Sequence, residues 1–165
     1  MKPPEQATWR RQVAPADAKA VGELVRATGF FSDEEAEIAV ELVLERLERG
    51  EASGYDFLLA EDQAGLAGYA CFGRIPGTQA SFDLYWIAVR PSSQGRGLGR
   101  ELLARGEALI AEQGGARIYV DTSSRPQYEP TRAFYLACGS RVAATLPDFY
   151  ALGDGKVVFC KVLSR

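Results

Sequence analysis

The sequence predicts an α/β fold in which a mixed, mostly antiparallel sheet of six to seven strands is flanked by about four helices. Apolar residues recur at helical spacing in some segments and alternate in others, which distinguishes helices from strands. Glycine and proline stand at most of the boundaries between these segments. The 165 residues and the 47% hydrophobic content suit one domain, which we place at residues 7–164.

The first expected elements are a short strand and two helices. Residues 8–13 are extended, and apolar residues then recur with a helical period from Ala18 until Gly29 ends the run. A second helix opens with a capping box at residues 32–35, in which a serine and a glutamate satisfy each other's backbone donors. It ends in arginines followed by Gly50, as the helix dipole favours.

The pattern then changes to that of a sheet with two further helices. Three β-rich runs separated by glycine and proline predict an antiparallel meander at residues 55–61, 66–75 and 81–90. The remaining elements are expected as a helix from Leu98 to the glycines at 114–115, a strand at 118–122, a short helix at 130–138, and two closing strands at 142–145 and 157–163. The order is therefore β-α-α-β-β-β-α-β-α-β-β.

The composition excludes several classes of function. The chain contains no histidine, so a Ser-His-Asp triad, an imidazole base and a His-ligated zinc site are impossible. A net charge of −3 argues against nucleic acid as the main partner. The N-terminus lacks the apolar core of a signal peptide, and no run approaches membrane-spanning length. Three widely spaced cysteines form no metal pattern, and we expect a cytoplasmic protein with reduced thiols.

The segment after residue 90 is the most informative for function. A predicted buried strand runs into a turn with Gly95, Gly97 and Gly99 at alternate positions, and this turn opens a helix. Glycines let the backbone fold tightly, and a helix start adds unpaired N–H donors and the positive end of the dipole. The turn therefore suits an anion such as a pyrophosphate, and Arg96 and Arg100 add charge.

Two other interpretations of this turn start from the same residues. It fits a plain strand-turn-helix connection, because glycine-rich turns are common. A dinucleotide site requires G-x-G-x-x-G, but the sixth position is Arg100 when counted from Gly95 and Leu102 when counted from Gly97. Asp121 falls about where a ribose-binding acid would lie, but the surrounding chain is not a series of βαβ units.

The segment Gln94-Gly95-Arg96-Gly97-Leu98-Gly99 resembles the Q/R-x-x-G-x-G/A signature of the GNAT superfamily of acyl-CoA-dependent N-acetyltransferases. Residues 84–89 resemble the family's central strand, and residues 132–139 resemble its F-Y-x-x-x-G helix. The order of elements matches the family over about residues 8–163. The resemblance implies the GNAT acyl-CoA N-acyltransferase fold.

The resemblance implies acetyl-CoA as co-substrate, with no metal. Backbone amides of the turn and the helix start would hold the pyrophosphate, and the preceding strand would pair with the pantetheine arm and offer an N–H to the thioester carbonyl. The expected cofactor-binding residues are Ile87, Ala88, Val89, Gln94, Gly95, Arg96, Gly97, Leu98, Gly99, Arg100, Thr131 and Arg132. Thr131 and Arg132 are included by position only, because Tyr128 stands where the family often has a cofactor-binding asparagine.

Two residues are the expected catalytic groups. Asp83 lies eleven residues before Gln94, a spacing at which the histone acetyltransferase branch of the family carries its base. The aspartate is one methylene shorter than glutamate, so it works through a water, or else it positions the substrate or merely faces solvent. Tyr135 matches the family tyrosine that donates to the departing thiolate, although its place also suits a core tyrosine. Without histidine, the rate should rise with pH without an imidazole step.

The acceptor is expected to be a small-molecule amine or a peptide or protein N-terminus. The loop between the last strands, residues 146–155, resembles the substrate loop of N-terminal acetyltransferases through Phe149 and Tyr150, which also suit loop anchors. The second helix is acidic, which suits a cationic amine or a solvated face. The resemblance also leaves room for a homodimer. The alternative function is a GNAT-fold module that binds acyl-CoA as a sensor or interaction domain without turnover.

Overall fold

The structure is a computed structural model that describes residues 6–163. Its regular elements are β1 (Thr8–Arg10), α1 (Pro15–Ala27), α2 (Asp33–Arg49), β2 (Asp56–Asp62), β3 (Gly65–Arg74), β4 (Ser81–Val89), α3 (Leu98–Glu112), β5 (Arg117–Ser123), α4 (Glu129–Ala137), β6 (Arg141–Ala151) and β7 (Asp154–Val162). This order confirms the expected one. The expectation about the N-terminal segment concerns residues 1–5, which lie outside the described residues, as does Ser164. Between residues 6 and 163, no helix combines the length and apolar character needed to cross a bilayer.

The seven strands belong to one sheet in the order β1-β2-β3-β4-β5-β7-β6. β4 pairs with β5 in parallel, whereas the pairs β1–β2, β2–β3, β5–β7 and β7–β6 are antiparallel. The expectation of a mixed, mostly antiparallel sheet is therefore confirmed. The chain divides into two compact units, which we describe separately. The first comprises the chain up to Gly73 with Trp86–Gly106, and the second comprises Arg74–Tyr85 with the chain from Glu107 onward.

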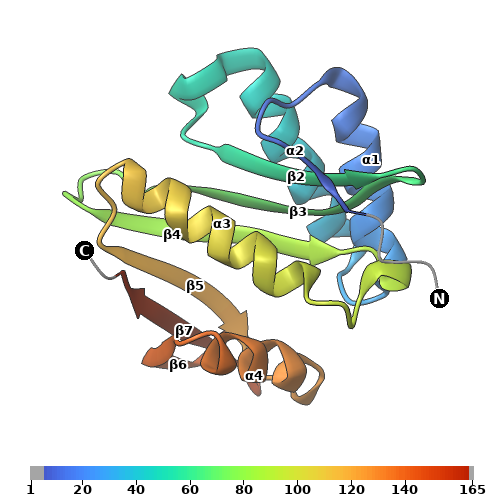
Figure 1. The fold of residues 1–165 in the computed structure, drawn as a ribbon. Coiled ribbons are helices and arrows are strands. Elements are labelled where there is room, and N and C mark those ends of the chain that lie inside the picture. Colours follow the sequence, from blue (N-terminus) through green and yellow to red (C-terminus); the bar gives the residue numbers. More distant parts are fainter. Residues whose placement is uncertain (1–5, 164–165) are drawn as a thin grey trace. The chain divides into compact units, whose positions relative to one another are not determined.

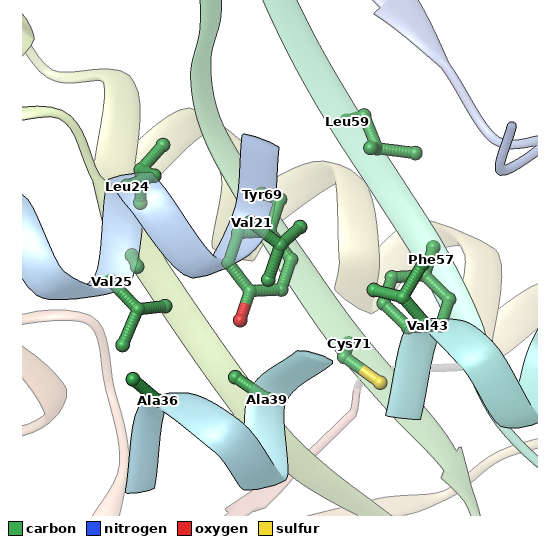
Figure 2. Packing of buried hydrophobic residues seen from close by; sticks show 11 residues of the cluster. Val21, Leu24, Val25, Ala36, Ala39, Val43, Phe57, Leu59, Tyr69 and Cys71 are labelled. Atoms are coloured by element: carbon green, nitrogen blue, oxygen red, sulfur yellow. The ribbon is translucent and has the colours of Figure 1, made fainter. Parts of the chain in front are cut away.

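The core of the first unit forms where α1 and α2 pack against β2 and β3 (Figures 1 and 2). Helical residues spaced three or four apart meet alternate residues of the strands, which is the geometry that buries one helix face on a sheet. The buried cluster includes Val21, Leu24, Val25, Ala36, Ala39, Val43, Phe57, Leu59, Tyr69 and Cys71. In Figure 2 the hydroxyl of Tyr69 points between the two helices, and it has no hydrogen-bond partner among the described residues.

The start of α2 has the capping box that the sequence predicts. The Glu35 N–H donates to Ser32 Oγ at 3.1 Å, and the Ser32 N–H donates to Glu35 Oε2 at 2.7 Å. Two backbone donors that the helix leaves unpaired are thereby satisfied. The helix ends at Gly50, whose φ of 59° lies in the region that favours glycine.

The second unit is built on the ladder from β4 through β5 and β7 to β6. One face of this ladder is apolar and buries Phe82, Ile118 and Phe159. The Lys161 ammonium, near the end of β7, donates to both oxygens of Glu107 at 2.9 Å and to the Cys138 carbonyl at 2.7 Å. This half-buried ammonium therefore holds α3 and the end of α4 on the same strand.

The expectation of a ten-residue loop at 146–155 is wrong. β6 continues to Ala151 and β7 begins at Asp154, so the connection between the two strands is a short turn. Leu146 lies opposite Lys156, and the next pair along the ladder is Ala151 opposite Asp154. Residues 147–150 of β6 therefore bulge out against the single residue Gly155 of β7. Pro147 has no N–H to give to the ladder, and Asp148 has a φ of 55°, so both residues interrupt regular pairing. Both features are typical of a loop, which is why the sequence predicts a loop here.

Candidate active site

In the first unit, β4 leads into a glycine-rich turn and then into α3 (Figure 1). A short 3-10 helix, η2 (Pro91–Ser93), opens the turn. Gly95 and Gly97 have φ values of 77° and 84°, which L side chains rarely adopt. A Cβ at either position would meet nothing within 4 Å, so open space lies beside the main chain. The turn therefore presents accessible backbone where a ligand can approach closely.

The beginning of α3 supplies the donors of this turn. The Gly97 carbonyl accepts the first helical hydrogen bond, from the Glu101 N–H at 3.0 Å, so the N–H groups before Glu101 have no partner within the helix. The Gln94 side chain folds back and donates to the Val89 carbonyl at 3.0 Å, which closes the turn. Arg96 and Arg100 are exposed and form no ion pair with another described residue. Oriented donors, a helix dipole and two free cations together can bind an anion such as a pyrophosphate.

The strand before the turn contributes main chain rather than side chains. Ala88 is buried in the core of the first unit, and Ile87 and Val89 are half-buried.

In the second unit, Asp83 is the last residue of β4 that pairs with β5, where it lies opposite Tyr119. Its side chain is half-buried. Burial, reinforced by the charge of Asp121, raises the pKa of the Asp83 carboxyl above its usual value, while Lys156 opposes the shift. A carboxyl with a raised pKa is a stronger base once it is ionised, which suits an acceptor of a proton from an amine.

Asp121 and Lys156 lie near Asp83 but were not expected at this site. Lys156 Nζ lies 3.1 Å from Asp121 Oδ2 and 4.0 Å from the centre of the Phe149 ring. Asp121 follows Tyr119 by two residues and therefore shares the face of the sheet with Tyr119 and Asp83. The alternation of side chains along β5 predicts Asp121 on the face of Asp83, but only after Asp83 is known to lie opposite Tyr119. Lys156 left no comparable signal in the sequence.

Tyr135 lies in α4 on the opposite face of the ladder in the second unit. Its ring contacts that of Phe159, with 5.8 Å between the centroids, and Phe159 is paired with Val120. Asp83, Tyr119 and Cys160 occupy the other face, because neighbouring residues on a strand point to opposite sides. Tyr135 is 4% exposed, and burial raises the pKa of its phenol. The phenol is therefore protonated throughout the neutral range.

The two remaining expected residues, Thr131 and Arg132, lie in α4 and are half-buried. The Arg132 Nη1 donates to the carbonyls of Ser123 at 2.6 Å and Arg125 at 3.0 Å. This side chain thus fastens α4 to the end of β5 and to the segment after it.

The fold agrees with comparisons to known proteins. The sequence profile of the acetyltransferase (GNAT) family matches residues 19–139, which is most of the chain. A crystal structure of a GNAT-family protein from Desulfovibrio desulfuricans is similar, with a TM-score of 0.92 and 44% identity, over 96% of this chain and 99% of that one. No curated protein sequence matches the chain significantly.

Two further solved structures share the fold at lower identity. One is an aminoglycoside 6'-N-acetyltransferase complexed with coenzyme A, with a TM-score of 0.74 and 20% identity over 96% of this chain and 98% of that one. The other is the ribosomal-protein-S18-alanine N-acetyltransferase from Escherichia coli, with a TM-score of 0.73 and 20% identity over 96% and 95%. The family profile and the close structural relative decide the assignment: the chain belongs to the GNAT family of acetyltransferases.

Proposed function

We propose that the protein is an N-acetyltransferase that moves an acetyl group from acetyl-CoA to a primary amine by direct attack in a ternary complex. The observation that carries this proposal is the turn after β4, in which Gly95 and Gly97 leave open space beside unpaired donors at the start of α3. We further propose that residues 7–164 work as one domain, in the cytoplasm.

The co-substrate supplies the activated acetyl group as a thioester, and this chain supplies its binding site. The amides of residues 94–99 hold the pyrophosphate, with charge added by Arg96 and Arg100. The main chain of residues 87–89 pairs with the pantetheine arm, and an N–H of this strand donates to the thioester oxygen as negative charge develops there. Thr131 and Arg132 complete the proposed cofactor contacts from α4.

Asp83 and Tyr135 handle the protons. The reference pKa of an α-amine is about 7.7–8.0 and that of lysine about 10.4, so the acceptor must lose a proton before it attacks. Asp83 takes that proton, directly or through a water. As the C–N bond forms and the C–S bond breaks, Tyr135 donates its hydroxyl proton, or a hydrogen bond, to the departing thiolate. The raised pKa of Tyr135 keeps the phenol protonated at neutral pH, but it also makes the phenol a weaker acid, so it favours a hydrogen bond to the thiolate over full transfer of the proton.

Asp83 and Tyr135 lie on opposite faces of the ladder, and direct attack requires both groups to reach the same acetyl group. The amine would approach on the face that carries Asp83 and Asp121, where carboxylates attract a cation. The Phe149 ring lies against Lys156, the ion-pair partner of Asp121, and offers an aromatic surface. We propose that the acceptor is a small-molecule amine or a peptide or protein N-terminus; a homodimer is compatible with either. The two less similar structures are named an aminoglycoside 6'-N-acetyltransferase and a ribosomal-protein-S18-alanine N-acetyltransferase, so one name refers to a small molecule and the other to a protein.

The test is amine-dependent thiol release from acetyl-CoA over a library of amines and peptides. Tyr135→Phe should lower kcat by about 100-fold, the effect typical of losing a general acid, while the rise in Tm with acetyl-CoA persists. Tyr69→Phe is the matched control, because it also removes a buried hydroxyl but leaves kcat unchanged.

Other outcomes would support the alternatives. Binding of acetyl-CoA without amine-dependent release would favour the sensor, and an unchanged kcat in Tyr135→Phe would remove the acid role. Gly97→Asp should abolish the Tm shift, because it puts a negative side chain into the space beside the turn. If acetyl-CoA fails to raise the Tm of the native protein, both the enzyme and the sensor are wrong.

A further inference from the structure

The side chain of Arg90 is enclosed by hydrogen bonds at the point where β4 passes into the turn. Its Nε donates to Ser92 Oγ at 3.0 Å, and its Nη2 donates to Ser93 Oγ at 2.9 Å. Both hydroxyls belong to η2, the first part of the turn. A planar guanidinium fixes the direction of each of these bonds, which a lysine ammonium would not do.

The same guanidinium binds the turn between β2 and β3. Its Nη2 pairs with Asp62, which is 28 residues away in sequence. The other oxygen of Asp62 accepts from the Ala64 N–H at 2.9 Å and so shapes the β2–β3 turn. The hydrogen bond from Arg90 outweighs the effect of burial and lowers the pKa of the Asp62 carboxyl below its usual value. The pair is therefore charged at neutral pH.

Two main-chain hydrogen bonds lie at the same place, one from Arg90 to β3 and one that closes η2. The Arg90 N–H donates to the Ala67 carbonyl at 2.8 Å, and the Ser93 N–H donates to the Arg90 carbonyl at 2.8 Å. The side chains of Arg90 and Asp62 are 22% and 17% exposed, so water competes only weakly for their charges. The beginning of the turn is thus tied to the β2–β3 hairpin.

We propose that Arg90, held by Asp62, is a positioning residue for the cofactor: it sets the conformation of the turn and so preorganises the amides of residues 94–99 for a pyrophosphate. This inference rests on the proposed function of the turn. Preorganisation improves affinity because the loop is already ordered when the ligand arrives. The distribution of charge agrees, since Arg96 and Arg100 are free for the anion whereas Arg90 is neutralised by a carboxylate.

A direct contact between Arg90 and the phosphate is the competing explanation, and Asp62→Asn separates the two. If Arg90 bound phosphate itself, releasing it from its carboxylate would leave the affinity for CoA unchanged or raise it. If Arg90 acts by positioning, Arg90→Met and Asp62→Asn should each lower the affinity for CoA by about tenfold. The double variant should then bind CoA as tightly as Arg90→Met does, because both changes remove the same interaction.

The experiment measures CoA binding by calorimetry and amide hydrogen exchange of the ligand-free protein. In both variants we expect weaker binding of CoA and faster exchange at residues 93–99. S-acetylpantetheine lacks the pyrophosphate, so its kcat/KM should not change, while the KM for acetyl-CoA rises. Arg90→Lys should restore only part of the affinity.

Arg46→Met is the matched control. Arg46 is 24% exposed and pairs with Asp56 in the same unit, at 3.6 Å, but it does not touch the turn. This variant should leave the affinity for CoA unchanged.

Three results would overturn the proposal. The first is that Arg90→Met leaves both the amide exchange of the turn and the affinity for CoA unchanged. The second is that Asp62→Asn binds CoA as well as the native protein does. The third is that the variants lose kcat/KM equally with acetyl-CoA and with S-acetylpantetheine. Should the native protein not bind CoA, the proposed function fails, and exchange in the ligand-free variants still decides whether Arg90 orders the turn.

Discussion

The pKa of Asp83 is set by its burial and by two charged neighbours that the strands bring around it. Burial in the sheet opposes ionisation most strongly, Asp121 on β5 adds to this, and Lys156 on β7 reduces it. Asp121 and Lys156 are themselves paired, so removing either one exposes Asp83 to the uncompensated charge of the other. The two substitutions therefore act on the pKa of Asp83 in opposite directions.

Lys156→Met should raise the pKa of Asp83 further, and Asp121→Asn should lower it. If Asp83 is the base, the acidic limb of the pH profile of kcat/KM moves to higher pH in the first variant and to lower pH in the second. Profiles over pH 5–9 at low ionic strength measure this. Asp83→Asn is the reference, since it should abolish the limb. If the acidic limb lies at the same pH in both variants as in the native protein, Asp83 is not the base.

The packing of α3 on β3 depends on the absence of a side chain at Gly68. A Cβ at this position would lie 3.0 Å from Leu102 Cδ1, 3.1 Å from the Ala88 carbonyl oxygen and 3.4 Å from Leu98 Cδ2. One of these neighbours is main chain and cannot move aside easily. Leu98 is the first residue of α3, so the contact fixes the helix at the end where the turn arrives.

Gly68→Ala should destabilise the protein by about 1–3 kcal/mol, as overpacking a tight core does, and should weaken CoA binding. Gly106→Ala is the matched control within α3. Its Cβ would make an ordinary contact with Phe72 at 3.9 Å, and alanine favours a helix over glycine by up to about 1 kcal/mol. Urea unfolding and CoA calorimetry measure both effects. A Gly68→Ala variant as stable as the native protein would show that α3 adjusts.

For the molecule as a whole, stability against acid depends on carboxylates that are paired in the folded state. Asp17 is buried, which raises its pKa, but hydrogen bonds from Arg10 and from the Ala14 N–H outweigh burial and lower it overall. Arg10 also pairs with Glu61, so this guanidinium connects β1, α1 and β2. A carboxyl whose pKa is lower in the folded state stabilises the fold above its unfolded pKa, near 3.9, and loses this effect as pH falls through the folded pKa.

The free energy of unfolding should therefore fall as the pH drops below about 4, and Asp17→Asn should flatten that dependence while lowering stability at pH 7. Urea unfolding between pH 3 and 7 tests this. Glu37→Gln, an exposed carboxyl on α2, should leave the curve unchanged. If the free energy of unfolding of Asp17→Asn depends on pH as steeply as that of the native protein, other groups govern acid unfolding.

Local chemistry made much of this protein predictable. The capping box at Ser32, the glycine pattern at residues 95–99 and the alternation of apolar residues each act within a few positions of the chain. Segments whose local signals conflict were not predictable, as the last hairpin shows. Pro147 and Asp148 are typical of a loop, yet the pairing of β6 with β7 on both sides of them keeps the segment within a strand.

The order of elements, the family and the turn proposed to bind the pyrophosphate could be predicted from the pattern of residues, because each depends on residues that are neighbours along the chain. What surrounds those residues could not be predicted in this way and is visible only in the folded chain. The tertiary structure placed Asp121 and Lys156 around Asp83, joined Arg90 to Asp62, and set Tyr135 on the face opposite Asp83. Contacts of this kind depend on strand pairing and register, which side-chain pattern alone does not specify between distant segments.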